Sequence, residues 1–271
     1  MLKIICYLLL AYCVLVTGLY LAQRHIVFQP DTRKPDRGTW QAYSMYEVTL
    51  RTSDNLKLLS WYKPARNNLP TIIYLHGNAS HIGPRFRAMQ PFLLAGYGLL
   101  LVEYRGYGGN SGTPTEAGLY HDARAAFAFL KQQYVPASCQ VLWGESLGSG
   151  VAMQMAIEFP SAALILQSPY TNLVEVGQYH YPWLPVKWLL KDRFDSFSKV
   201  AHVNVPIFWL HGGADNVVPA ELGKRLFEAL PEPKQGLLVR QAGHHDIHNY
   251  AFKPIHDFLT QQVKCHTDNI N

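Results

Sequence analysis

The apolar positions of the chain follow two different patterns. Residues 4–22 form one uninterrupted apolar run without a charge, whereas from residue 46 onward short apolar runs alternate with amphipathic stretches. About 20 apolar residues suffice for a helix that crosses a bilayer, and short runs rich in Val, Ile and Leu are typical of strands buried in a parallel sheet. The pattern predicts a transmembrane anchor at residues 1–25, a juxtamembrane linker at 26–45 and one α/β domain at 46–265.

The second part of the pattern predicts a doubly wound, mostly parallel sheet. Its strands are expected at residues 46–52, 56–62, 71–75, 99–103, 140–143, 163–166, 207–210 and 237–240, and its helices at 85–94, 115–133, 147–158, 219–229 and 250–264. The first two strands alternate polar and apolar residues across Ser53-Asp54-Asn55, which predicts an antiparallel hairpin. The regular alternation of strand and helix that follows is typical of α/β folds.

Residues 170–200 interrupt this alternation. The segment lies between the sixth and seventh predicted strands and is rich in aromatic residues: Tyr170, Tyr179, Tyr181, Trp183, Trp188, Phe194 and Phe197. An insertion there would cover the carboxyl edge of the sheet, so we predict a small aromatic cap. A long connection packed on the core is a second interpretation of the same residues.

The N-terminal run has a second interpretation as a cleaved signal peptide, with Lys3 as its basic flank. Cleavage before Gln23 would require a small residue where the bulky Tyr20 stands, so a retained single-pass anchor is favoured. Basic residues after the run favour a cytosolic domain, whereas the very short N-terminal tail favours export. The side of the membrane therefore stays open.

Composition excludes several classes of protein. With 271 residues, 48% of them apolar, the chain can bury a large core and is neither a disordered tail nor a coiled coil. The net charge is +5, but the basic residues are scattered, so we expect no nucleic-acid partner and favour a place beside an anionic membrane. Cys139 and Cys265 alone lie outside the apolar run, too few for a disulfide framework, and Cys139 is expected to be a small core residue.

The segment Gly144-Glu145-Ser146-Leu147-Gly148 matches the G-x-S-x-G motif between a predicted strand and a predicted helix. This context is that of a nucleophile elbow, a sharp turn that presents the serine hydroxyl at the edge of the sheet. A glycine-rich helix start is the plainer interpretation. We predict that Ser146 is a nucleophile.

A serine nucleophile needs a base and a group that orients the base. In α/β hydrolases the acid and then the histidine follow the serine along the chain, and Asp215 follows the seventh predicted strand while His244 follows the eighth. His245 is the alternative base. A metal site at His244, His245 and His248 lacks an accompanying metal-binding motif, so we predict no metal and no cofactor.

An oxyanion hole requires two N–H groups near the nucleophile. The amide of Leu147 is one candidate because it follows the nucleophile. Asn78, in the loop after the third predicted strand, is the other. His76 is expected to be a structural residue beneath this loop.

Several longer segments strengthen this interpretation. They are YLHGNAS at 74–80, EYRGYGGNSGTPTEAGLYHDARAA at 103–126, GESLGSGVA at 144–152, YPWLPVKWLLKDRFDS at 181–196, HGGADNVVP at 211–219 and AGHHDI at 242–247. Together they resemble the membrane-anchored α/β-hydrolase-domain family, which includes the bud-emergence-related serine hydrolases and their bacterial and animal relatives. The resemblance covers about residues 70–250, and His245 departs from the asparagine common in relatives.

The resemblance implies a serine hydrolase that cleaves esters or thioesters, with Ser146, Asp215 and His244 at the triad positions. The chain is similar to animal members that remove palmitate from proteins, although those carry an N-terminal cysteine cluster instead of a spanning run. The cap and the anchor favour lipophilic acyl substrates. A catalytically silent scaffold that binds a lipid or protein, and a peptidase of the same fold, are alternatives, and the oligomeric state stays open.

Overall fold

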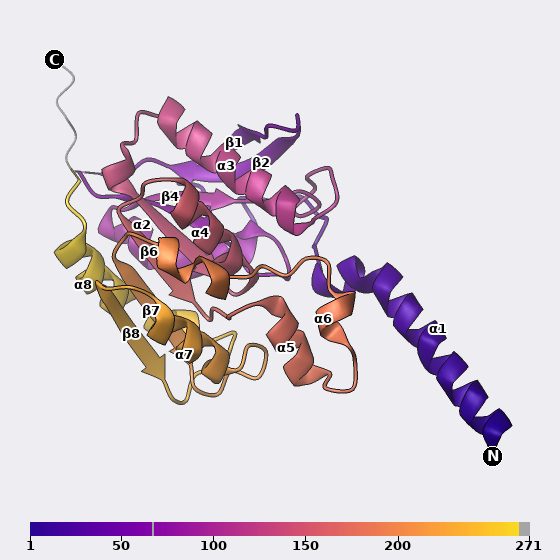
Figure 1. The fold of residues 1–271 in the computed structure, drawn as a ribbon. Helices are drawn as coiled ribbons and strands as arrows, with labels where there is room; N and C mark the ends of the chain where they lie inside the picture. Colours follow the sequence, from indigo (N-terminus) through magenta and orange to yellow (C-terminus); the bar gives the residue numbers. More distant parts are fainter. Residues whose placement is uncertain (67, 266–271) are drawn as a thin grey trace.

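The protein consists of an α/β domain from which one long helix projects (Figure 1). The computed structural model describes residues 1–66 and 68–265. The strands are β1 (Tyr46–Arg51), β2 (Lys57–Lys63), β3 (Thr71–Leu75), β4 (Gly98–Val102), β5 (Gln140–Glu145), β6 (Ala163–Gln167), β7 (Ile207–Gly212) and β8 (Lys234–Val239). The helices are α1 (Leu2–Val27), α2 (Ile82–Ala95), α3 (Glu116–Gln132), α4 (Leu147–Glu158), α5 (Leu173–His180), α6 (Val186–Leu189), α7 (Ala220–Ala229) and α8 (Phe252–Gln262), with short 3-10 turns η1 (Ala137–Cys139), η2 (Phe197–His202) and η3 (Ile247–Tyr250).

The strands form one sheet in the order β1-β2-β4-β3-β5-β6-β7-β8. β1 pairs with β2 and β2 with β4 in antiparallel register, and every later pair is parallel. The predicted mostly parallel sheet with an antiparallel lead-in is therefore confirmed. β3, β4 and β6 are buried along their whole length, as their continuous apolar sequences require.

Two hydrophobic cores flank the sheet. Side chains of α3, α4 and α7 pack with Ile73 and Leu75 on one face, and side chains of α2 and α8 pack with Ile72 and Tyr74 on the other. Successive residues of a strand point to opposite faces, so β3 alone supplies both cores. The carboxyl ends of the parallel strands are left free of these helices, which is where sites of open α/β sheets gather.

The edge strand β8 begins three residues earlier than its apolar residues predict. Its first residues are Lys234, Gln235 and Gly236, and they are partly or fully exposed. An edge strand needs backbone pairing on one side only, so its sequence carries a weaker apolar signal. The sequence pattern therefore misses its start.

The aromatic segment contains two short helices that the sequence pattern did not predict. Asn172 caps α5 by accepting a hydrogen bond from the Glu175 amide at 2.9 Å, and α6 follows after Pro185. Asp192 ties the end of the segment to the domain, because its Oδ1 accepts from the Glu116 amide at the start of α3 at 2.9 Å. We call residues 170–200 the cap.

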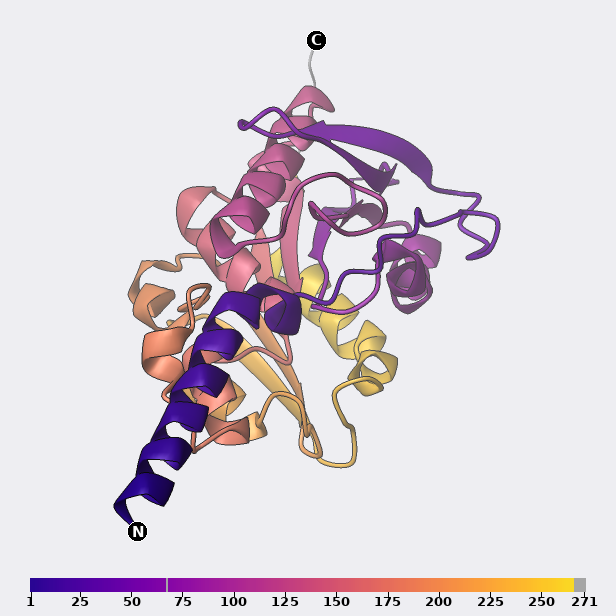
Figure 2. The same cartoon turned by 90° about the vertical axis from the view of Figure 1, so that its right-hand side faces the viewer.

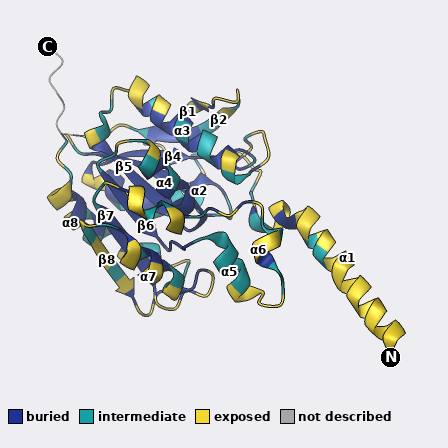
Figure 3. Cartoon of the chain, viewed as in Figure 1, coloured by how far each residue is buried: buried dark blue, intermediate teal, exposed yellow. Residues whose placement is uncertain are grey.

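The helix α1 leaves most of its surface exposed (Figure 3). It is long and apolar enough to cross a membrane by length and composition. Its carboxyl end continues into Phe28, which is buried in the core of the domain, and runs alongside the cap segment (Figure 2). The helix is thus joined to the folded domain by packing as well as by the chain.

Cys139 is buried, as expected, but it is also paired. The structure records a disulfide between Cys139 in η1 and Cys265 beyond α8, with Cα atoms 4.9 Å apart. The expectation of a simple core cysteine was incomplete because the partners are 126 residues apart in sequence. Their proximity follows from the packing of α8, which the spacing of two cysteines does not reveal.

Arg105 joins the loop after β4 to α3 through two acidic residues. Its guanidinium contacts Asp54 at 2.6 Å and Asp122 at 2.8 Å, and its amide donates to the fully buried Asp122 at 2.9 Å. Replacing Arg105 with alanine is expected to lower the free energy of unfolding by about 3–5 kcal/mol, because Asp122 keeps a buried charge without its cationic partner. Thermal unfolding of the purified chain in detergent measures this loss.

The matched control is Arg124→Ala. Arg124 pairs with Glu158 at 2.7 Å at the surface, where such a pair contributes about 0–1 kcal/mol. Equal unfolding temperatures for the two variants would show that the buried Arg105–Asp122 pair stabilises the fold no more than the surface Arg124–Glu158 pair.

Candidate active site

Ser146 occupies a strained turn between β5 and α4. Its backbone has φ 50° and ψ −118°, a conformation that residues other than glycine rarely adopt. The surrounding structure holds this geometry: the Ser146 amide donates to the Gln167 carbonyl at 2.9 Å and its carbonyl accepts from the Ser149 amide at 2.8 Å. Such strain in a strand-turn-helix element matches the nucleophile elbow predicted from the motif.

The glycines of the motif are required by close packing. A Cβ at Gly144 would lie 2.6 Å from the Gly148 carbonyl oxygen and 2.7 Å from the Ala152 Cβ. A Cβ at Gly148 would collide with the backbone carbonyl of Leu75 at the end of β3. Both positions therefore exclude any larger residue, and the turn fits tightly against the central strands.

Asp215 and His244 meet beyond the carboxyl ends of β7 and β8. The His244 Nδ1 lies 2.7 Å from Asp215 Oδ2, and Asp215 Oδ1 accepts from the amides of Val217 and Val218 at 2.9 and 2.8 Å. Burial alone would raise the pKa of Asp215, but hydrogen bonds with His211 and His244 outweigh it and hold this pKa well below its usual value. Asp215 is therefore ionised at neutral pH and suited to orient an imidazole.

The structure distinguishes the two neighbouring histidines. His244 is largely buried and faces Asp215, whereas the exposed His245 contacts His244 edge to face at 5.4 Å between ring centroids. The turn is fixed by Asp246, whose Oδ1 accepts from the Gly243 amide at 2.7 Å. Within the described residues, no group of three His, Cys, Asp or Glu side chains is placed to hold a metal ion.

His211 is a partner of Asp215 that the sequence did not single out. It is fully buried, with Nε2 3.5 Å from Asp215 Oδ2 and 3.0 Å from the Val218 carbonyl oxygen. It therefore packs beneath the loop that carries Asp215. The sequence feature that could have identified His211 is its place as a histidine at the end of the apolar strand IFWLHG.

The predicted oxyanion residues lie beside Ser146. Asn78, Ser146 and Leu147 line the same cavity, and a Cβ on Gly77 would lie 3.3 Å from the Ser146 Cβ. The Asn78 side chain is occupied elsewhere, since its Oδ1 accepts from the Gln29 amide at 2.9 Å and from the Tyr107 hydroxyl at 3.0 Å. The side chain thus fixes the loop and leaves the backbone of the loop next to the serine.

His76 is buried beneath this loop, as expected. Its Nε2 lies 3.0 Å from Glu103 Oε1, and its Nδ1 lies 2.7 Å from the Gly77 carbonyl oxygen. Glu103 Oε2 in turn accepts from the Ile82 amide at the start of α2 at 2.9 Å. These contacts fix the backbone of the loop from below.

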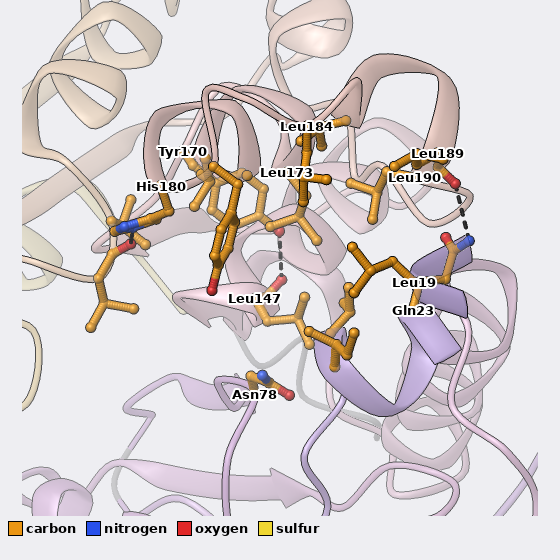
Figure 4. A pocket seen from close by; sticks show the side chains of 18 of the residues that line it. Leu19, Gln23, Asn78, Leu147, Tyr170, Leu173, His180, Leu184, Leu189 and Leu190 are labelled. Carbon is orange, nitrogen blue, oxygen red and sulfur yellow. Dashed lines mark hydrogen bonds between the residues drawn. The ribbon is translucent and has the colours of Figure 1, made fainter. Parts of the chain in front are cut away.

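Ser146 lines an apolar cavity of about 530 Å³ (Figure 4). One wall comes from the cap, with Leu173, Leu184 and Leu190, and another from α1, with Leu19 and Gln23. Tyr170 closes part of the cavity near α4, where its hydroxyl donates to the Leu147 carbonyl at 3.2 Å. The cavity is shaped for a hydrocarbon group.

His244 lines a second cavity of about 530 Å³, which we call the polar cavity because charged and polar side chains share its lining with apolar ones. Glu145 lies in it and accepts a hydrogen bond from the Tyr74 hydroxyl at 2.6 Å, while Arg85 Nε lies 3.3 Å away. Burial would raise the pKa of Glu145, but the Arg85 charge, the Tyr74 hydrogen bond and the nearby histidines together outweigh burial and lower this pKa. The serine therefore borders a mainly apolar cavity and the histidine a cavity of mixed lining.

The structure brings Asp215 and His244 together directly and places Ser146, Leu147 and Asn78 around one cavity. Among the hydrogen bonds of the described residues, none joins Ser146 Oγ to His244 Nε2. In unliganded enzymes this contact is often long and shortens when substrate binds. The arrangement is chemically suited to acyl transfer from a carbonyl compound to a serine.

Comparisons with known proteins agree with this geometry. The family model of the alpha/beta hydrolase fold matches residues 70–203. An uncharacterised protein of Mycobacterium tuberculosis is 40% identical over 237 residues, covering 85% of this chain and 83% of that protein. The lysophosphatidylserine lipase ABHD12 of Danio rerio is 36% identical over 195 residues, covering 64% of this chain and 51% of the lipase.

Solved structures share the fold. The esterase Pf2001 of Pyrococcus furiosus has a TM-score of 0.71 at 20% identity and covers 86% of this chain and 99% of its own. At this identity the likeness concerns the fold alone. The sheet order, the strained turn at Ser146 and the matched sequences lead to one conclusion: the chain has the alpha/beta hydrolase fold and belongs to the same family as the Mycobacterium tuberculosis protein.

Proposed function

We propose that the protein is a serine hydrolase that cleaves carboxylic esters or thioesters of lipophilic acyl groups. The observation that carries the proposal is the apolar cavity that contains Ser146 at its strained turn. A hydrocarbon chain in this cavity has its carbonyl carbon next to the serine hydroxyl. Holding the two reactants together in this way removes much of the entropic barrier to attack.

In the proposed mechanism His244 takes the proton of Ser146 as the hydroxyl attacks the acyl carbonyl. Asp215, already bonded to His244 Nδ1, fixes the tautomer that leaves Nε2 free to accept this proton and stabilises the imidazolium. The backbone amides of Asn78 and Leu147 stabilise the oxyanion, each by about 3 kcal/mol. His244 then protonates the leaving group, and water releases the acyl group by the same route.

The two cavities suggest how an amphiphilic substrate divides between them. The acyl chain occupies the apolar cavity, while the alcohol or thiol leaves toward His244 and the polar cavity with Arg85 and Glu145. A relative from Danio rerio is named a lysophosphatidylserine lipase, which supports a lipid substrate with a polar headgroup for this chain as well.

We further propose that α1 anchors the enzyme in a membrane as a single-pass segment. Its length and apolar composition support this assignment, and a cleavage before Gln23 would cut the helix at a residue that packs on the cap. Membership among the membrane-anchored hydrolases that include the bud-emergence-related proteins stays a prediction from the sequence.

A fluorophosphonate probe tests the proposed function. We expect the full-length protein in detergent to react with the probe and peptide mapping to find the adduct on Ser146, because an activated serine attacks the phosphorus, expels fluoride and is phosphonylated. Hydrolysis of p-nitrophenyl acetate, octanoate and palmitate then gives the preferred chain length. A folded protein that neither reacts nor hydrolyses any ester would instead be a silent scaffold.

A further inference from the structure

The helix α1 forms part of the wall of the apolar cavity. Leu15, Leu19, Gln23, Ile26 and Val27 all line it together with the cap and Ser146. Leu15, Leu19 and Gln23 are four residues apart, and Ile26 and Val27 follow Gln23 by three and four residues, so all five lie on one side of the helix. Figure 4 shows Leu19 and Gln23 approaching the cap residues Leu189 and Leu190 across the cavity.

Specific polar contacts hold α1 in this place. The buried Gln23 donates from Nε2 to the Leu189 carbonyl at 3.0 Å and accepts at Oε1 from the Lys191 amide at 2.7 Å. Both ends of its amide are thus satisfied by the backbone of the cap, as a buried polar group requires.

The next residue adds an ion pair. Arg24 Nε lies 3.0 Å from Asp192 Oδ2, and the other carboxylate oxygen of Asp192 accepts from the Glu116 amide at the start of α3. The helix is therefore fastened to the cap and, through Asp192, to the domain.

The wall extends from the site into the apolar part of α1. From Leu15 to Val27 a helix rises about 18 Å, a distance comparable with an extended long-chain acyl group. Leu15 and Leu19 belong to the run that is apolar enough to lie in a bilayer. The cavity therefore runs from the serine toward the membrane.

The cap beside α1 carries exposed aromatic side chains, of which Tyr181 and Trp183 also line the cavity. Trp183 and Trp188 are 57% and 80% exposed, and Tyr179 and Tyr181 are exposed as well. Tyr12 of α1 donates to the Trp183 carbonyl at 3.0 Å, which places this surface next to the apolar helix. Exposed Trp and Tyr gather where proteins meet lipid and water, so this side of the cap is suited to contact the lipid around α1.

We infer that a membrane-resident amphiphile with a single acyl chain enters sideways from the bilayer between α1 and the cap, and that Leu15 and Leu19 set the accepted chain length. The inference rests on the proposed function, because the ester must reach Ser146. Under this inference, α1 both anchors the protein and determines which acyl chains the site accepts.

Leu19→Trp tests this wall, with Leu21→Trp as the matched control. Leu19 is half-buried at the cavity, whereas Leu21 is 74% exposed on the same helix. In the full-length protein reconstituted in phosphatidylcholine vesicles, we expect Leu19→Trp to lower the ratio of kcat/KM for p-nitrophenyl palmitate over acetate about tenfold. Leu21→Trp is expected to keep the wild-type ratio.

Equal ratios in the two variants would overturn the inference while leaving ester hydrolysis intact. If the wild type hydrolyses no ester, the proposed function fails and this inference fails with it. Should Leu19→Trp not fold, Leu19→Phe with the control Leu21→Phe makes the same comparison with a smaller side chain.

A photo-reactive probe gives a second readout that does not depend on turnover. A long-chain alkyl fluorophosphonate with a diazirine at the end of its chain is first attached to Ser146 and then irradiated. We expect crosslinked peptides from α1 near Leu15 and Leu19. Crosslinks confined to peptides of the polar cavity would overturn the inference.

Discussion

Replacing Ser146 with alanine is expected to lower kcat for p-nitrophenyl octanoate about 10⁶-fold. The variant lacks the atom that forms the acyl-enzyme, so the oxyanion amides and the cavity supply the only remaining catalysis. Steady-state and single-turnover assays on the full-length protein in detergent measure the loss, and reaction with the fluorophosphonate should disappear. The strained backbone at this position accommodates alanine as it does serine, since neither has a branched Cβ.

Ser149→Ala is the matched control for this experiment. Ser149 is fully buried in the same helix, three residues beyond the turn, and it does not line the apolar cavity. We expect it to keep activity and probe labelling. A Ser146→Ala protein that still turns over the ester at the wild-type rate would remove Ser146 from the mechanism.

Replacing His244 with alanine is expected to lower kcat by a comparable factor of about 10⁶, because the triad acts as a unit and the serine without its base is a weak nucleophile. His245→Ala is the control, since its exposed ring meets His244 rather than Asp215. We expect that variant to stay within about twofold of wild type, because loss of the edge-to-face contact leaves the bond between His244 and Asp215 in place.

The same assay decides between the two histidines. Loss of activity in His245→Ala with retention in His244→Ala would reverse the assignment made from the sequence. Thermal unfolding of both variants shows whether either change acts through stability, and the Asp215–His244 bond predicts a small loss for His244→Ala alone.

Much of the fold follows from the sequence because the sheet is buried. Continuous runs such as TIIYL and ALILQ lie in strands covered on both faces, so apolar composition and strand structure coincide. The start of the edge strand β8 and the cap helices escaped prediction for the opposite reason. Their residues are partly exposed, and the packing of α5 against α6 at Gly177 and Val186 brings together positions that no local pattern relates.

The candidate site was predictable to the extent that local geometry defines it. The elbow at Ser146 is a property of a few adjacent residues, and the loops after β7 and β8 necessarily end at the same edge of the sheet. The Glu145–Arg85 contact and the polar cavity depend on contacts between distant segments. His211 is only four residues from Asp215, but its contact with Asp215 depends on the shape of the turn after β7. The catalytic roles of Ser146, Asp215 and His244 stay predictions, although the structure places His244 against Asp215.

Because α1 forms a wall of the apolar cavity and contacts the cap at Gln23, the width of this cavity depends on the angle between α1 and the cap. A transmembrane helix tilts when the hydrocarbon thickness around it changes. Gln23 and Arg24 fasten the carboxyl end of α1, whereas Tyr12 holds its middle by one exposed hydrogen bond to the cap. If α1 spans a bilayer, a tilt that breaks this bond would swing Leu15 and Leu19 away from the cap. An enzyme anchored in this way would prefer different acyl chains in thin and thick membranes, so the lipid composition of its compartment would help to choose its substrate.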